Sequence, residues 1–522
     1  MIQQRDNGNT LSLNIMDIDW KHIRPAEFVG KTGSSDGGKI ESSDDGKFFQ
    51  AHKLRFKVPL CHTSEENPEP IELQAELVYS SGPSIVSAAN ADGKLDIQVV
   101  DSTRPNNTKP MVVYLCGGPG DANPAFANPE LNKIILKKWR LPILFLDYRG
   151  TGESTAVTAA ALAERKSPSE YLTLFRQDAI VADLEAIRLC FRGVKFLLVG
   201  QSFGGWIAIT YVSFLPGSLS GVFITGGLPP IGKGPEDVYT ALYVGVIRAN
   251  KQYYAKYPKD AEKVKEIVKW LAKAGGKDKD SKSRGVALRD EQRLSPQGFM
   301  TLGRHFGRGK AGFKGVHFLV TRMAKDIKNG GLASDTIAYF SDSGGAGFKL
   351  HKRPCYGTLH EPIYCSGTMK APPNWAAQDV GRQQRGGHFR WLKKDFDSSV
   401  LDMDAFKNVP LYFTREMIHD FILGDTGPAA APFKEHADDL ARRVQWSTLY
   451  DVRQLSQNMV PVRALVYPKD LFVDFDFSLQ TAAMVRRCQA VPARRSWLHG
   501  SVKTRPKQVC RVLFRSDILR EG

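Results

Sequence analysis

A serine lies between two glycines in the segment GQSFG at residues 200–204, which has the pattern G-x-S-x-G. The apolar run VKFLLV precedes this segment and GWIAITYVSF follows it, which predicts a strand, a tight turn and a helix. Such a turn holds a serine hydroxyl at the end of a strand, where the amino end of the next helix favours developing negative charge. Because many Gly- and Ser-rich loops match the short pattern by chance, the flanking elements carry our prediction that Ser202 is a nucleophile.

A serine nucleophile needs a base and an acid that orients the base. Asp470 follows the apolar run RALVYPK, and His499 is the one histidine of the sequence beyond that turn. The chain order serine, acid, histidine is typical of hydrolases with this type of serine turn. We therefore predict a triad of Ser202, Asp470 and His499. Asp474 and Asp476 remain alternatives for the acid, and a surface histidine is the alternative interpretation of His499.

The oxyanion formed in acyl transfer needs two donors in fixed positions. We predict the backbone N–H of Phe203, directly after the serine, as one donor. The second is predicted at Gly118 in the loop CGGPG, because glycines let the backbone approach a substrate closely. An ordinary Gly-Pro turn is the alternative interpretation of this loop. Cys116 has no local base, so we interpret it as a packed small residue rather than a nucleophile.

The segments around these motifs alternate between strand and helix patterns. MVVYLCGGPG, from residue 111, and LPILFLDYRGTGES, from residue 141, each predict a buried strand that ends in glycines. SEYLTLFRQDAIVADLEAIRLCF has apolar residues at helical spacing, and GVFITGGLPP predicts another strand. Strands that alternate with helices form a parallel sheet wrapped by helices. We therefore predict an α/β protein of the α/β-hydrolase fold, with a mostly parallel central sheet.

We expect four parts along the chain. Residues 1–50 are polar and rich in Gly, Ser and Asp near 32–47, which predicts a loosely ordered lead-in. Residues 51–228 form the first part of the core, and from 229 to 408 the alternation gives way to a mainly helical cap inserted into the core. Residues 409–522 form its second part and end in an atypical tail, which is short, basic and interrupted by proline. Within this tail we interpret CRVLFRSD as translated adapter sequence.

Composition narrows the class of protein. The chain has 522 residues, 42% of them apolar and 24% charged, which is ordinary for a soluble globular protein. A net charge of +17 attracts polyanions in general, but the sequence has no zinc-finger spacing, RNA-binding aromatic signature or basic zipper. Seven cysteines without a CxxC pair argue against a zinc site and favour a reducing compartment. No signal peptide or long apolar run is present, so we expect a cytoplasmic protein without nucleic-acid or membrane partners.

Taken together, the motifs resemble those of the prolyl aminopeptidases (proline iminopeptidases), serine peptidases of the α/β-hydrolase fold. The resemblance spans residues 50–500 and is closest to the larger microbial type. The matching segments are GGPG at 117–120, DYRGTGES at 147–154, GQSFGGW at 200–206, TGGLPP at 225–230, LSPQGF at 294–299, HEPIYC at 360–365 and VYPKDLFVDF at 466–475. The loop CGGPG departs from the family, in which many members carry His or Gln before the glycines.

The resemblance implies a peptidase that releases an N-terminal proline, or another small residue, from short peptides without a metal or cofactor. In the family, glutamates of the cap hold the substrate amine, and the matching candidates are Glu361 in LHEPIY and Glu416 in FTREMI. A salt bridge within the cap is the alternative role for both. Two other functions remain open: an esterase or lactonase with the same triad, and an inactive hydrolase-like interaction protein. The sequence does not indicate an oligomeric state.

Overall fold

The computed structural model describes most of the chain. The described residues are 18–32, 38–41, 48–63, 68–80, 83–89, 95–101, 110–123, 129–191, 194–274, 285–308, 310–342, 350, 353–393, 396–425, 427, 430–494, 499, 501 and 505–514. Residues 1–17 of the predicted lead-in and the final residues 515–522 therefore lie outside the described part.

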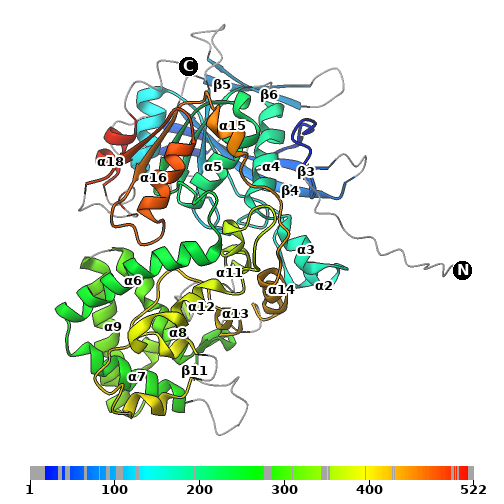
Figure 1. Ribbon diagram of the computed structural model, residues 1–522. Coiled ribbons are helices and arrows are strands. Elements are labelled where there is room, and N and C mark those ends of the chain that lie inside the picture. The colour runs from blue at the N-terminus through cyan, green and yellow to red at the C-terminus, as the bar shows by residue number, and fades with distance from the viewer. Residues whose placement is uncertain are drawn as a thin grey trace, which may run out of the picture.

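A ten-stranded sheet runs through the upper half of the molecule in Figure 1. Its strands are β1 (Glu27–Thr32), β2 (Gly38–Glu41), β3 (Phe48–Pro59), β4 (Pro70–Ser80), β7 (Met111–Leu115), β8 (Ile143–Leu146), β9 (Phe196–Gln201), β10 (Leu219–Thr225), β13 (Val462–Val466) and β14 (Cys488–Pro492). Their order is β1-β3-β4-β8-β7-β9-β10-β13-β14, with β2 also paired to β3. The strands from β8 to β14 are parallel and those from β1 to β8 are antiparallel. The predicted mostly parallel sheet of the α/β-hydrolase fold is confirmed.

Apolar residues on both faces explain why helices cover the sheet on both sides. In β7, Met111, Val113 and Leu115 join one core cluster and Val112 and Tyr114 the other, as the two-residue period of a strand requires. The first cluster packs under α4 (Gln177–Cys190) and α5 (Phe203–Phe214). The second packs under η1 (Ile134–Trp139), which follows α1 (Pro129–Lys133), and under α18 (Pro506–Leu513). The atypical tail therefore contributes a helix to the core.

Two smaller features differ from the sequence prediction. The predicted lead-in contains β1 and β2, which pair with β3, although its polar composition did not predict strands. The segment KLDIQVVD resembles an antiparallel edge strand in the sequence. It contains β6 (Leu95–Asp101), which instead pairs with β5 (Pro83–Ala89) in a separate two-stranded ribbon.

A helical body lies below the sheet in Figure 1 and is inserted between β10 and β13. Its main elements are α6 (Pro235–Lys256), α7 (Asp260–Lys273), the hairpin β11 (Val286–Ala287) and β12 (Arg293–Leu294), α8 (Pro296–Met300), η5 (Thr301–Arg308), α9 (Lys310–Lys328), α10 (Ser334–Asp342), α11 (Pro354–Leu359), η6 (Pro362–Tyr364), α12 (Ala376–Gln383), α13 (Asp420–Asp425) and α14 (Pro432–Ala441). Helices continue past residue 408, since α15 (Val452–Ser456) precedes β13. The predicted boundary at 408/409, between the helical cap and the second part of the core, therefore stays a proposal.

Aromatic packing holds the helical body together. The Tyr253 ring of α6 lies 5.1 Å from Phe306, 5.8 Å from Phe313 and 5.9 Å from Phe413 between ring centroids. These residues come from four segments of the helical body, and they belong to the same hydrophobic cluster as one face of the sheet. None of the helices in the described part of the chain is long and apolar enough to cross a bilayer.

Candidate active site

Ser202 lies at the tight turn between β9 and α5. Its backbone has φ 53° and ψ −123°, a region that residues other than glycine rarely adopt. Neighbouring glycines allow this turn, because a Cβ on Gly200 would lie 2.6 Å from the carbonyl oxygen of Gly204. A Cβ on Gly204 would lie 2.1 Å from the carbonyl oxygen of Leu115. The turn leaves Ser202 half-buried at the carboxyl edge of the sheet, as a nucleophile elbow requires.

The glycine loop after β7 lies against this serine. A Cβ on Gly117 would lie 3.2 Å from the Cβ of Ser202 and 3.7 Å from its Oγ. Gly118 has φ 146°, a backbone conformation that glycine adopts readily and other residues rarely adopt. The backbone of Phe203 begins α5 directly after the serine. The structure thus brings both predicted donor segments next to Ser202, and the donor roles of Gly118 and Phe203 stay predictions.

His499 and Asp470 contact each other across the ends of β13 and β14. His499 Nδ1 lies 2.9 Å from Asp470 Oδ2, and the Asp470 side chain is only 2% exposed. Its second oxygen, Oδ1, accepts the backbone N–H groups of Phe472 at 2.8 Å and Val473 at 3.3 Å. The carboxylate is therefore held in one orientation, with one oxygen on the backbone and the other on the imidazole.

The electrostatics of this pair favour a charged imidazole. Burial lowers the pKa of His499, but the charge and hydrogen bond of Asp470, with a contribution from Glu416, outweigh burial and raise it overall. A triad histidine must accept a proton as the serine attacks, so this environment suits a general base.

The alternative acids have other partners. Asp474 Oδ1 accepts the backbone N–H of Phe477 at 2.9 Å and caps the amino end of α16 (Phe475–Met484). Asp476 lies in the first turn of the same helix. Of these three carboxylates, Asp470 is the one that contacts His499, and the triad assignment stays a prediction.

Two consecutive glycines after β10, Gly226 and Gly227, pack against His499 and Ser202. A Cβ on Gly226 would lie 2.7 Å from His499 Nδ1, and a Cβ on Gly227 would lie 2.3 Å from the carbonyl oxygen of Ser202. The structure thus brings Ser202 and His499 to opposite sides of one glycine turn. In the sequence, TGGLPP was recognised only as a family motif. Its doubled glycine after a buried strand was a usable signal for a close approach of two other segments.

The two predicted amine-binding glutamates differ in their surroundings. Glu416 is half-buried, its Oε1 accepts the hydroxyl of Tyr356, and its charge acts on His499. Glu361 is 4% exposed, and its oxygens accept the backbone N–H groups of Ala376 at 2.7 Å and Trp375 at 3.2 Å. Glu361 therefore caps α12, and burial raises its pKa to about 7. The charge of Glu416 therefore acts on the predicted triad histidine, whereas the Glu361 carboxylate is engaged by backbone N–H groups.

Arg415 is a site residue that sequence reasoning missed. Its side chain is fully buried, its Nη1 donates to the carbonyl oxygen of Leu471, and its guanidinium lies 4.8 Å from the Phe472 ring centroid. Burial lowers the pKa of Arg415 to about 9, although the negative charges of Asp470 and Glu416 act to raise it. Arg415 thus links the cap to the turn that carries the acid. An Arg-Glu pair in the apolar run LYFTREMI was the available signal.

An apolar cavity lies beside these residues. It has a volume of about 190 Å³, and Trp206, Pro230 and Tyr364 line it. The same three residues also line another, much smaller cavity, which reaches Phe472. The Phe472 ring centroid lies 5.0 Å from that of His499, so this smaller cavity approaches the predicted triad. The lining of the larger cavity suits a small apolar ring.

The fold and the arrangement of these side chains define an α/β hydrolase. The family model of the alpha/beta hydrolase fold matches residues 110–263, which include the serine turn and the glycine loop.

Curated relatives narrow this class. The chain is 30% identical over 505 residues to proline iminopeptidase aneH of Aspergillus aculeatus, covering 95% of this chain and 97% of that protein. It is 30% identical over 473 residues to a proline iminopeptidase of Aeromonas sobria, covering 88% of this chain and 95% of that protein. A proline iminopeptidase of Lactobacillus helveticus is 34% identical over 104 residues, which are 20% of this chain and 31% of that protein. The chain belongs to the proline iminopeptidase family of α/β hydrolases.

Proposed function

We propose that this protein is a serine aminopeptidase that releases an N-terminal proline, or another small residue, from short peptides. The observation that carries the proposal is the half-buried Glu416 carboxylate, whose charge acts on the triad histidine. A protonated secondary amine pairs with such a carboxylate, whereas an ester or lactone does not need one. The relatives called proline iminopeptidases support the same substrate class.

In the proposed reaction Ser202 Oγ attacks the first carbonyl carbon while His499 takes its proton. Asp470 holds the imidazole and stabilises its charged form. The N–H groups of Phe203 and Gly118 stabilise the oxyanion, and His499 then gives its proton to the leaving amine. Water hydrolyses the prolyl ester of Ser202, again with His499 as base. Each step uses a side chain or backbone group at the carboxyl edge of the sheet.

In this proposal the cap carboxylates decide which bond is cut. The first carbonyl carbon lies two bonds from the substrate nitrogen, so fixing the amine at Glu416 aligns the first peptide bond with Ser202. Glu361 is the second amine-binding residue of the proposal. Each of its oxygens has another lone pair, so it can accept the amine without giving up the N–H groups of Trp375 and Ala376.

The test compares a proline arylamide with p-nitrophenyl acetate. We expect the wild-type protein to hydrolyse the arylamide and Ser202→Ala to hydrolyse neither substrate. Glu416→Gln should lower kcat/KM for the arylamide about 10–100-fold, because one hydrogen bond to a charged group is lost. It should leave the ester rate within about 2-fold at a pH above the acid limb of the profile, where His499 is neutral in both proteins. Glu435→Gln, at an exposed position of α14, is the matched control and should change neither rate.

Two results would overturn the proposal. Rapid turnover of the acyl ester without arylamide hydrolysis would indicate an esterase. A protein whose serine does not react with a fluorophosphonate probe would instead be an inactive member of the fold.

A further inference from the structure

A second cavity, of about 350 Å³, is lined by Ile18 and by three further segments that are far apart in the sequence. They are the loop at Leu60–His62 after β3, the stretch 165–179 that runs through α3 (Pro168–Thr173) into α4, and Arg443–Ser447 after α14. Its lining shares no residue with the predicted triad, the glycine loop or the cavity at Trp206. Small-molecule sites have volumes of this order. The cavity is therefore a separate candidate binding site.

The floor of this cavity is apolar and aromatic. Tyr171, Leu174 and Trp446 line it, and Trp446 is only 3% exposed. The indole N–H of Trp446 donates to the carbonyl oxygen of Arg443 at 3.2 Å, and the Tyr171 ring lies edge-on to Phe175 at 4.9 Å. Both rings are fixed before a ligand arrives, so binding of an apolar body would cost little side-chain entropy.

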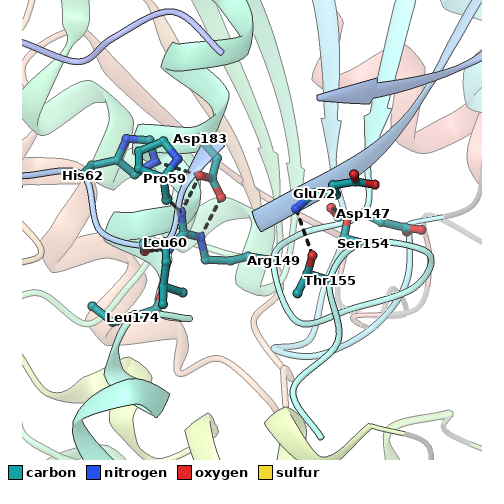
Figure 2. A network of polar contacts seen from close by, with 10 residues as sticks. All are labelled: Pro59, Leu60, His62, Glu72, Asp147, Arg149, Ser154, Thr155, Leu174 and Asp183. Carbon is teal, nitrogen blue, oxygen red and sulfur yellow. Dashed lines mark hydrogen bonds and ion pairs between the residues drawn. The ribbon is translucent and has the colours of Figure 1, made fainter. Parts of the chain in front are cut away.

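A buried ion pair, drawn in Figure 2, joins two of these lining segments. Arg149 donates to Asp183 through Nε at 2.7 Å and Nη2 at 2.5 Å, and both side chains are fully buried. Arg149 also donates to the carbonyl oxygens of Leu60 at 2.6 Å and Leu174 at 2.8 Å. The His62 ring nitrogen Nε2 lies 2.8 Å from Asp183 Oδ1. Since Leu60, His62 and Leu174 all line the cavity, one charged network preforms its wall.

Positive charge gathers around the aromatic floor. Of the four lysine and arginine side chains in the lining, two are neutralised by carboxylates. Arg165 binds Glu69 through two hydrogen bonds of 2.6 Å, and Arg443 pairs with Glu170.

The other two cations, Lys166 and Arg176, have no carboxylate within ion-pair distance among the residues that the structure describes. Lys166 is exposed at the rim, while Arg176 is buried with its guanidinium 4.7 Å from the Trp446 ring centroid. Arg176 donates to Ser447 Oγ at 3.0 Å and to the carbonyl oxygens of Pro362, at 3.0 Å, and Cys365. Ser447 in turn donates to Asp178, whose charge also acts on Arg176. The described lining holds four lysine and arginine side chains and two carboxylates, Glu170 and Asp178, so an anion in the cavity would meet a net positive charge.

We propose that this cavity binds a small organic carboxylate with an apolar or aromatic body. The carboxylate lies at Lys166 and Arg176, and the body packs on Trp446 and Tyr171. The positive charge of the lining favours an anionic ligand, and the fixed rings of Trp446 and Tyr171 favour an apolar or aromatic one.

Calorimetric titration of the full-length protein with indole-3-acetate, decanoate and the neutral indole-3-acetamide tests the proposal. At least one of the two carboxylates should bind with 1:1 stoichiometry, and the acetamide at least 10-fold more weakly than the acetate. A preference between indole-3-acetate and decanoate distinguishes an aromatic from an aliphatic body. The protein is first inactivated with a fluorophosphonate, so that the active site does not contribute.

Two variants locate the site. Lys166→Met should weaken carboxylate binding about 3–10-fold, since it removes one exposed charge. Ala179→Leu, which adds volume to the lining, should weaken it more than 10-fold. Lys138→Met, at an exposed position of η1 on the other face of the sheet, is the matched control and should not change binding. Because Lys166 is exposed, its variant keeps the test decisive even if Ala179→Leu folds poorly.

The proposal is overturned if neither carboxylate binds, if acid and amide bind equally well, or if Lys166→Met and a folded Ala179→Leu protein both bind like wild type. Binding is measured without catalysis, so these outcomes are independent of the peptidase activity proposed above.

Discussion

The edge of the sheet and the helical body contribute different parts of the candidate site and hold them in different ways. Ser202 and Asp470 follow β9 and β13 within a few residues, and backbone turns fix them. Glu361 and Glu416 lie in irregular segments of the helical body, and contacts from other segments fix them. In the proposed reaction, the strand ends position the reacting groups, whereas packing within the helical body positions the carboxylates that bind the substrate amine.

The largest effect on activity is expected from a substitution at the sheet edge, in the turn that carries Asp470. Asp470→Asn should lower kcat for a proline arylamide by about 10⁴-fold, because an amide stabilises the wrong imidazole tautomer and cannot stabilise the imidazolium. Asp474→Ala removes a helix cap from the same turn, so it should cost about 1 kcal/mol of stability and change kcat less than about 3-fold. Steady-state kinetics and thermal unfolding of both variants check this. The reverse pattern would make Asp474 the acid.

An intermediate effect is expected at Arg415, where the two regions meet. Arg415→Met removes the hydrogen bond to Leu471 and a positive charge that lowers the pKa of His499. We expect kcat/KM to fall about 10–100-fold, since the turn that carries Asp470 loses a hydrogen bond from a charged group. The acid limb of the pH–kcat/KM profile should move to higher pH, because the imidazolium becomes more stable.

Arg415→Lys is the matched control for this prediction. It keeps the positive charge, so the acid limb should stay near its wild-type position even if the rate falls. A limb that does not move in Arg415→Met would show that the residue acts on folding alone.

The smallest effect is expected in the helical body. The pKa of Glu361 is about 7 in the folded protein, above the ordinary value of 4.5, so its protonated form favours folding. Its contribution is fully present below pH 4.5 and is lost as the pH rises through about 7. Glu361→Gln removes this dependence. The stability advantage of wild type over Glu361→Gln should therefore shrink by about 1–3 kcal/mol between pH 5 and pH 8. Thermal unfolding at both pH values measures it, and parallel curves would contradict the assignment.

Much of the fold was predictable because its signals are local. Apolar runs ending in glycines predicted β7 and β8, and the parallel sheet that they belong to is confirmed. The polar residues 1–50 gave no sign of β1 and β2, which exist because β3 supplies their hydrogen-bond partners. The serine turn was visible in GQSFG, while Gly226 and Gly227 acquire their role only through contact with His499 and Ser202.

The sequence by itself determined the class of fold and the serine turn, because both depend on residues close together in the chain. Tertiary structure decided that Asp470 contacts His499 while Asp474 caps α16. It also decided that Glu361 caps α12 and that Arg149 joins two lining segments of a second cavity, at Leu60 and Leu174. The physical reason is that a side chain's partner is set by which distant segments pack together, and local patterns of residue type do not encode that choice.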